Sequence, residues 1–370
     1  MFKRIRGAML ASVAATLTVF LPLQQADACT SFLIKSADGG FAYGRTLEFG
    51  LPLQSQLMIA PRHYDFKGTG PDGQAGTGLS WSSKYAVVGA NAFGLPVFID
   101  GMNEAGLAGG LLYFPGYAQF QDVPADQARS SIAPHELLTY LLSNFATIEE
   151  VKAGLPKIKV NRSIQAQLKI TAPIHATLHD ASGASIVVEY LDGKLNIFDN
   201  PTSVMTNAPS FEWHIANLSN YLQISPYNPA PVKVGSLALN PPSTGSGGLG
   251  LPGDMSSPSR FVRAFQYSRL APVSPTSTDA VDTAFHILNN FDLPPGFVRT
   301  SSDAAVGGGV ASIEITEFMS VADLKTKRYY MRTYSNSQSQ MLDLTRADLD
   351  ARQIKYFPID RASGPIDVLK

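Results

Sequence analysis

The stretch that decides how this chain folds is "ACTSFLIKSADGGFAYGRTLEF", residues 28–49, which holds Cys29, the only cysteine among 370 residues. Two strand-like runs lie on either side of the turn residues Ala37-Asp38-Gly39-Gly40. Such runs around a glycine-containing turn predict a β-hairpin. A single thiol at the start of a hairpin then raises the question of what it does there.

The register of the hairpin decides which side chains share a face with Cys29. If Ser36 pairs with Phe41 across the turn, the numbers of paired residues sum to 77 and Cys29 faces Glu48. Neighbouring side chains on a strand point to opposite faces, so this register puts Arg45 on the face away from Cys29. A bulge or a different turn would be needed to bring both groups to the thiol.

Residues 1–28 are typical of a secretory signal peptide. Basic residues near the start are followed by the apolar run "AMLASVAATLTVFLPL" at 8–23 and the small-x-small triplet "ADA" at 26–28. The apolar run has 16 residues and contains Pro22, whereas a membrane-spanning helix needs roughly 20. A retained membrane anchor is therefore the less favoured alternative, and we expect cleavage after Ala28 and a periplasmic or secreted protein.

Composition excludes several classes of partner. Without Lys3, Arg4, Arg6 and Asp27, the chain from residue 29 onward has 26 Lys and Arg against 29 Asp and Glu, a net charge of about −3. That charge offers no footprint for nucleic acid or for an anionic membrane surface. A chain with one cysteine cannot form an internal disulfide, so its core depends on burial, for which 45% hydrophobic residues suffice.

The glycine-rich segment "NPPSTGSGGLGLPGDMSSPS", residues 240–259, predicts a long loop. It contains two G-x-G-x-x-G matches, but neither follows a strand or opens a helix, as a dinucleotide site requires. His175 and His179 have a spacing that would bind a metal on a helix, yet their surroundings are strand-like, where four residues span about 13 Å. We therefore expect no cofactor and no metal, and interpret both histidines as core or surface residues.

The remaining pattern alternates strand groups with paired helices. Helical patterns occupy 134–155, with Pro134 in the first turn, and 257–291, where Ser277 is the expected N-cap. This order indicates an α+β domain with two sheets and helices outside them. Further strand-like runs lie at 85–94, 96–114, 174–200 and 311–344.

Cys29 has a structural and a chemical interpretation. A lone cysteine is often a small buried hydrophobe. Cleavage after Ala28 would instead give Cys29 a free α-amine, and a thiol and an α-amine ionise at similar pH, so the amine can take the thiol proton. One residue would then carry both nucleophile and base. A Cys–His pair of the papain type lacks its local signature, because Cys29 is followed by "TSF".

A third interpretation of Cys29 is the lipidated cysteine of a bacterial lipoprotein, which would have no catalytic activity. Such sites usually carry Leu three positions ahead of the cysteine, where this chain has Ala26, with the acidic Asp27 next to it. Lipidation consumes both the thiol and the amine, so it excludes the chemical interpretation.

The hairpin sequence resembles the start of the choloylglycine hydrolase family, which includes penicillin V acylases, bile salt hydrolases and N-acyl homoserine lactone acylases. The resemblance implies an N-terminal-nucleophile hydrolase with a four-layer αββα sandwich that comprises residues 29–370, and it implies no cofactor. Four further blocks match in family order: "DGMNEAGLAGGLLYFPGYA" (100–118), "VMTNAPSFEWHIANLSNY" (204–221), "GLGLPGDMSSPSRFVRAF" (248–265) and "RYYMRTYSN" (328–336).

The resemblance also implies roles for residues near the nucleophile. Cys29 would be the nucleophile and, through its amine, the base, and Arg45 would lie against the thiol. Glu48 would hold the α-amine, although the family more often has Asp at this position.

Three further residues of the matching blocks would complete the site. Asn207 would donate a side-chain N–H to the oxyanion, and Tyr113 would supply a second donor from its backbone N–H. Arg260 would complete the charged site.

The implied substrate is a small-molecule amide, and Tyr113 bears on which one. Bile salt hydrolases commonly have Asn at this position and penicillin V acylases commonly have Tyr, so we expect an exported amidohydrolase of penicillin V acylase type. Its substrates would be phenoxyacetyl or long-chain N-acyl amides, including penicillin V and N-acyl homoserine lactones, and a conjugated bile salt is the alternative. Family members are often homotetramers. The aromatic side chains expected to bind the acyl group are Trp81, Phe93, Phe114, Tyr117 and Trp213.

Overall fold

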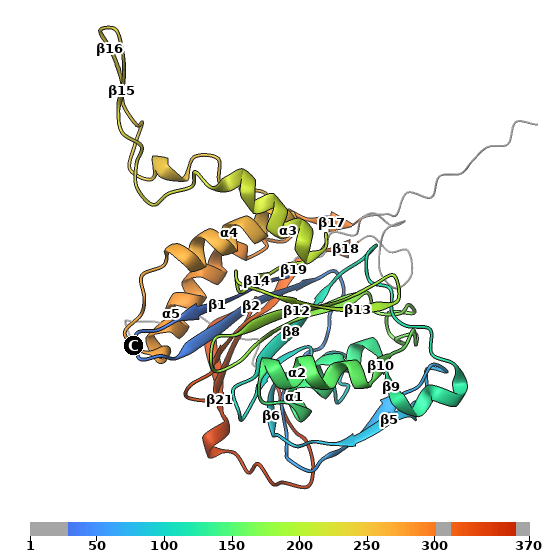
Figure 1. Cartoon of the computed structure of the whole chain (residues 1–370). Coiled ribbons are helices and arrows are strands. Elements are labelled where there is room, and N and C mark those ends of the chain that lie inside the picture. The colour runs from blue at the N-terminus through green and yellow to red at the C-terminus, as the bar shows by residue number, and fades with distance from the viewer. Residues whose placement is uncertain (1–28, 301–311, 360–370) are drawn as a thin grey trace, which may run out of the picture.

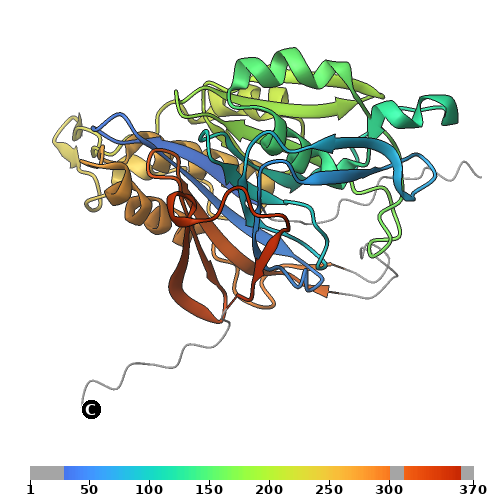
Figure 2. The same cartoon turned by 90° about the horizontal axis from the view of Figure 1, so that it is seen from below.

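The computed structural model describes residues 29–300 and 312–359. The predicted signal peptide lies outside these residues. Two antiparallel sheets stack face to face, with helices on the outer face of each, so the molecule has the predicted four-layer αββα architecture (Figures 1 and 2). No helix within the two described ranges has the length and apolarity needed to cross a membrane.

The first sheet carries the N-terminal hairpin at its centre and is covered by α4 (Ser257–Leu270) and α5 (Ser277–Leu288). The strands of this hairpin are buried on both faces, and the buried side chains include the polar Arg45, Thr46 and Glu48. Its six strands, in spatial order, are β14 (Val204–Met205), β1 (Thr30–Lys35), β2 (Phe41–Phe49), β19 (Ile315–Asp323), β20 (Arg328–Thr333) and β21 (Asn336–Asp343).

The second sheet packs against the inner face of the first and is covered by α1 (Leu137–Asn144) and α2 (Ile148–Gly154). Its eight strands, in spatial order, are β13 (Lys194–Asp199), β12 (Ser185–Leu191), β11 (Ile174–His179), β8 (Ala108–Tyr113), β7 (Asp100–Asn103), β6 (Val87–Ala90), β3 (Leu57–Ala60) and β22 (Lys355–Phe357).

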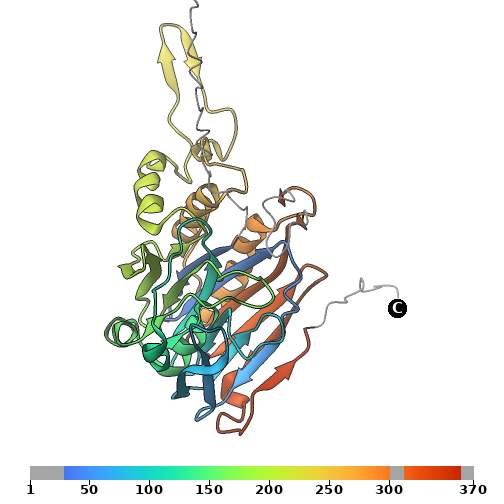
Figure 3. The same ribbon diagram turned by 90° about the vertical axis from the view of Figure 1, so that its right-hand side faces the viewer.

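Smaller elements extend from this body. A helix, α3 (Phe211–Leu218), follows β14 and contacts α4. The hairpin of β15 (Val232–Val234) and β16 (Leu237–Leu239) projects away from the body as an arm (Figures 1 and 3). The sequence did not predict this arm. The other paired strands are β4 (Asp65–Thr69) with β5 (Ala75–Ser82), β9 (Ser131–Ile132) with β10 (Lys159–Val160), and β17 (Arg299–Thr300) with β18 (Ser312–Ile313).

The predicted register of the N-terminal hairpin is wrong by one residue. Lys35 pairs with Phe41 and Ser31 with Arg45, so the numbers of paired residues sum to 76. The turn is longer than predicted because Ser36 leaves the ladder and its backbone N–H donates to the Gly40 carbonyl, 2.9 Å away. The shift brings Arg45 onto the face that Ser31, and hence Cys29, occupies.

Helix boundaries differ from prediction where side-chain caps decide them. α5 begins after Thr276, whose hydroxyl accepts from the Asp279 backbone N–H at 3.1 Å, while the Asp279 carboxylate accepts from the Thr276 N–H. This reciprocal cap moves the helix start one residue ahead of the predicted one. The predicted helical block 134–155 is split, because Thr147 caps a second helix by accepting from Glu150 N–H.

Candidate active site

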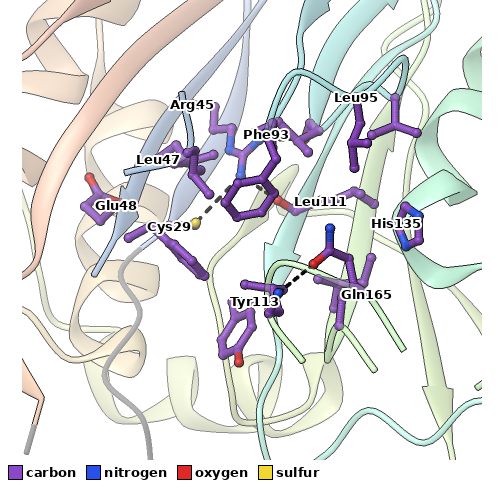
Figure 4. Close-up of a pocket in the computed structure, with 18 residues that line it drawn as sticks. Cys29, Arg45, Leu47, Glu48, Phe93, Leu95, Leu111, Tyr113, His135 and Gln165 are labelled. Atoms are coloured by element: carbon purple, nitrogen blue, oxygen red, sulfur yellow. Dashed lines mark hydrogen bonds between the residues drawn. The ribbon is translucent and has the colours of Figure 1, made fainter. Parts of the chain in front are cut away.

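A pocket of about 660 Å³, measured to include its opening to solvent, lies between the two sheets. Cys29 and Arg45 lie at one end, and Leu95, His135 and Gln165 at the other (Figure 4). The lining is mainly apolar, as that of small-molecule sites is. Its apolar lining residues are Leu47, Phe49, Leu53, Ala92, Phe93, Leu95, Val97, Ile99, Leu111, Leu168, Ala172 and Ile174.

The thiol of Cys29 forms part of this pocket wall although the residue is only 3% exposed. Its Sγ lies 3.6 Å from Nη2 of Arg45. Burial raises the pKa of the Cys29 thiol, and the positive charge of Arg45 opposes that rise. A thiol of raised pKa needs a base close by to become the thiolate that attacks a carbonyl.

The Arg45 guanidinium is fixed by backbone carbonyls of the facing sheet. Nη1 donates to the Ile99 carbonyl at 2.7 Å, and Nη2 donates to the Leu111 carbonyl. Because Leu111 lies in β8 and Ile99 directly precedes β7, Arg45 bridges the two sheets beside the Cys29 sulfur (Figure 4). The side chain therefore has one orientation, directed at the thiol.

Behind Arg45 lies a buried carboxylate that the sequence did not single out. Asp100 Oδ2 is 3.5 Å from Arg45 Nη1 and accepts from the Tyr43 hydroxyl at 2.9 Å. Its Oδ1 accepts from the hydroxyls of Tyr329 at 2.6 Å and Ser320 at 2.7 Å. With these partners Asp100 neutralises a buried guanidinium that would otherwise be costly to desolvate.

Gly110 in β8 makes room for this cluster. A Cβ atom at Gly110 would lie 2.6 Å from the Tyr43 hydroxyl, 2.9 Å from Asp100 Oδ2 and 3.2 Å from Arg45 Nη1. A glycine in the interior of a strand is explained by such a close approach.

Asn207 joins the nucleophile to the opposite side of the site. Its Oδ1 accepts from the Cys29 backbone nitrogen at 2.7 Å and from Arg260 Nη2 at 2.9 Å. Its Nδ2 donates to the Tyr113 carbonyl at 2.8 Å. An amide has two N–H bonds, and the described residues engage one of them in this way.

Arg260, at the start of α4, holds the first residues of β1. Its Nη1 donates to the Cys29 carbonyl and, at 3.0 Å, to the Thr30 hydroxyl. Its side chain is 1% exposed. Arg260 therefore fixes the backbone on one side of Cys29 while it also orients the Asn207 amide.

Glu48 also lines the pocket, but its carboxyl group lies on the face of β2 opposite Arg45, because side chains three positions apart on a strand point to opposite faces. Its carboxyl oxygens accept from the hydroxyls of Thr46 at 3.1 Å and Thr316 at 3.0 Å. Burial raises the pKa of Glu48 to about 8, against the opposing charge of Arg260. The sequence predicts Glu48 as the acceptor for the Cys29 nitrogen, whereas in the structure that acceptor is Asn207 Oδ1.

Tyr113 and Phe93 line the pocket. The other four aromatic residues that we expected to contact the acyl group are not among its lining residues. Trp81 packs between the β4–β5 hairpin and α1, and Phe114 is fully buried against a histidine of β11. Tyr117 stacks on Phe114, outside the pocket wall, and Trp213 is 45% exposed on α3. Aromatic character alone did not distinguish core from pocket.

The sequence left core and surface positions open for His175 and His179, and both are buried in β11. Within the described part of the chain, no group of three His, Cys, Asp or Glu side chains is arranged to bind a metal ion.

Comparison with known proteins agrees with this arrangement. Residues 29–357 match the model of the linear amide C–N hydrolases of the choloylglycine hydrolase family. A bile salt hydrolase/transferase of Clostridium perfringens is 33% identical over 340 residues, which cover 90% of this chain and 97% of that protein.

Two solved structures share the fold at similar identity. A mutant of the conjugated bile acid hydrolase of Clostridium perfringens has a TM-score of 0.79 and 29% identity, covering 92% of this chain and 99% of the other. The penicillin V acylase of Agrobacterium tumefaciens has a TM-score of 0.71 and 27% identity, covering 89% and 91%. The family match spans this αββα sandwich from Cys29 onward and makes the chain a linear amide C–N hydrolase. The chain belongs to the choloylglycine hydrolase family.

Proposed function

We propose that the protein hydrolyses an amide between an apolar acyl group and an amine, through a thioester on Cys29. One observation carries this proposal. The Cys29 sulfur lies at the end of an apolar pocket and against Arg45, while the Cys29 nitrogen is held by Asn207. The thiol, the nitrogen that cleavage would convert into an α-amine, and the pocket for the acyl group therefore lie next to one another.

Removal of residues 1–28 would create the base. In the whole chain the Cys29 nitrogen is a peptide N–H, and after cleavage behind Ala28 it becomes an α-amine. This amine takes the proton of the buried thiol, and the thiolate adds to the substrate carbonyl. The amide nitrogen leaves with a proton, and water then hydrolyses the thioester.

Two donors would stabilise the negative charge of the tetrahedral intermediate. They are the Asn207 side-chain N–H that the Tyr113 carbonyl does not take, and the backbone N–H of Tyr113, which would exchange its present partner for the substrate oxygen. Donors of this kind lower the barrier by about 2.7–4 kcal/mol each. The charge of Arg45 lies beside the Cys29 sulfur, and that of Arg260 lies beside the Asn207 side chain.

The proposed substrates are penicillin V and long-chain N-acyl homoserine lactones, because Tyr113 stands where bile salt hydrolases commonly have Asn. A conjugated bile salt is a second candidate, and the 33% identity to the Clostridium perfringens enzyme supports it. The test is a panel of these three substrates, with the released amine quantified. Highest kcat/KM on the bile salt would select the second candidate, and no turnover of any of them would contradict the proposal.

The apolar pocket predicts an effect of Phe93 on binding. Replacing Phe93 with Ala removes a ring that would cover the acyl group, which is worth about 1.5–3 kcal/mol if fully buried. We expect KM for the preferred acyl substrate to rise about tenfold or more with little change in kcat. Tyr117→Ala is the matched control, because Tyr117 packs outside the pocket wall, and an equal rise in KM there would contradict the assignment.

We also propose export to the periplasm or the medium, with cleavage after Ala28. The basic start, the apolar run and the "ADA" triplet support this proposal. A lipoprotein lipidated at Cys29 is the alternative, and the mass of the mature N-terminus separates the two.

A homotetramer is the proposed assembly. The family resemblance supports it, and so does the β15–β16 arm, whose Val232, Val234, Leu237 and Leu239 side chains are all more than half exposed. Apolar side chains gathered on a projecting hairpin are typical of a contact surface. Light scattering is expected to give a tetramer mass for the natural chain and a smaller mass for Leu237→Lys. A monomer mass for the natural chain would contradict the proposal.

A further inference from the structure

Two buried histidines contact the backbone of the segment that carries Asn207. His175 Nε2 lies 2.8 Å from the Thr206 carbonyl oxygen, and His214 Nε2 lies 3.0 Å from the Asn207 carbonyl oxygen. Both histidines are fully buried. A carbonyl oxygen only accepts, so both Nε2 atoms must carry a proton and donate it.

Each histidine ring is fixed by an aromatic neighbour of a site residue. The His175 ring stacks on Phe114, with centroids 4.2 Å apart and an interplanar angle of 13°. Phe114 directly follows Tyr113, whose carbonyl accepts from the Asn207 amide. His175 therefore links the end of β8 to the backbone ahead of Asn207.

His214 makes the corresponding link to α4. Its ring stacks on Phe261, with centroids 4.5 Å apart and an interplanar angle of 7°. Phe261 directly follows Arg260, which donates to the Asn207 side chain. Burial lowers the pKa of His214 to about 4, so the neutral ring carries its one proton on Nε2.

The second nitrogen of His175 has its own partner. Nδ1 lies 3.2 Å from Glu189 Oε1, and the same oxygen accepts from the Phe211 backbone N–H at 2.9 Å. The Nε2 proton is donated to the Thr206 carbonyl oxygen. The contact between Nδ1 and Glu189 Oε1 therefore requires a second proton, which lies between the ring and the carboxyl group. Phe211 is the first residue of α3, so Glu189 ties His175 to the helix that carries His214.

We propose that His175 and His214 are positioning residues, which hold the Thr206–Asn207 backbone and thereby fix the Asn207 amide beside Cys29. The inference rests on the proposed role of Asn207. Both rings reach the site only through backbone carbonyl groups, so they are not catalytic residues. A shift of Asn207 of about 1 Å is enough to lower a rate by up to about 100-fold.

The experiment compares two reactions of the single thiol in the mature enzyme. Acylation of Cys29 by 4-nitrophenyl butyrate passes through an oxyanion, whereas alkylation by iodoacetamide is a displacement at a tetrahedral carbon and needs no oxyanion donor. We expect His214→Phe, which keeps the stacking and loses the donor, to slow acylation at least tenfold and to change alkylation less than twofold. We expect the same pattern for His175→Phe.

Amide variants provide the matched control. Gln places its N–H near the former Nε2 position, and Asn, one methylene shorter, places it near Nδ1. His214→Gln should therefore restore acylation to near the natural rate, and His214→Asn should not. This pair decides the question even if the Phe variant fails to fold.

The outcomes are distinct. Equal acylation by His214→Gln and His214→Asn, or an equal loss of acylation and alkylation, would overturn the positioning role. If the natural enzyme is alkylated at Cys29 but is not acylated by the ester, the proposed function fails instead.

Discussion

Replacing Cys29 with Ala is expected to abolish amide hydrolysis, with a loss of about 10⁴-fold or more in kcat, because nothing else in the pocket can form the thioester. Cys29 is the only cysteine of the chain, so no second thiol can substitute for it. The variant should stay folded, since removing one small buried atom costs about 1 kcal/mol. Released amine and thermal unfolding are the two measurements, and turnover by Cys29→Ala would contradict the mechanism.

Cys29→Ser is the matched control, because it keeps the α-amine and changes only the attacking atom. A hydroxyl ionises far above the α-amine, so the amine removes its proton poorly. We expect intermediate activity, well below that of the natural enzyme and above that of the Ala variant. A rate equal to that of the natural enzyme would argue against direct attack by the thiol.

Asp100→Asn is expected to have the second largest effect, although Asp100 does not reach the substrate pocket. The change keeps the shape of the side chain and leaves the buried Arg45 guanidinium without its counter-charge. Breaking a buried pair in this way costs about 3–5 kcal/mol of the free energy of unfolding. We also expect kcat to fall, because Arg45 is the charged group next to the sulfur. Denaturant unfolding and steady-state kinetics measure the two effects.

Ser320→Ala tests whether charge is the cause. It removes one hydrogen bond to the same Asp100 carboxylate and leaves the charge in place. Such a loss costs about 1 kcal/mol. If the free energy of unfolding of Asp100→Asn is no lower than that of Ser320→Ala, the carboxylate charge does not hold Arg45.

The sequence predicted the parts of this structure that depend on local pattern. The hairpin and the two sheets with outer helices follow from local pattern, whereas the grouping of Arg45, Asn207 and Arg260 around Cys29 was implied by the family resemblance alone. The register was wrong because Ser36 joins the turn instead of the ladder, which a strand pattern does not show. That one residue decides which of Arg45 and Glu48 shares a face with the nucleophile.

Long-range contacts explain what the sequence could not predict. The pocket wall combines residues as distant as Leu47, Leu95 and Ala172, and none of them has a local signal of ligand contact. Asp100 reads as one polar residue in an apolar run, although from the second sheet it is the shared partner of groups on three strands of the first. His214 reads as a helix residue, and only the fold shows that it reaches the Asn207 carbonyl.

We propose that export converts Cys29 into a nucleophile with its own base, and the mass of the mature N-terminus is the decisive measurement. The enzyme is purified from the exported fraction, and its amide hydrolase activity is measured on the same sample. The mass of its N-terminal peptide is then determined by mass spectrometry. We expect an unmodified Cys29 as the first residue. When the thioester is trapped with substrate, we expect the mass of that residue to increase by the mass of the acyl group. An active enzyme that keeps residues ahead of Cys29, or that carries a lipid on it, would contradict the account.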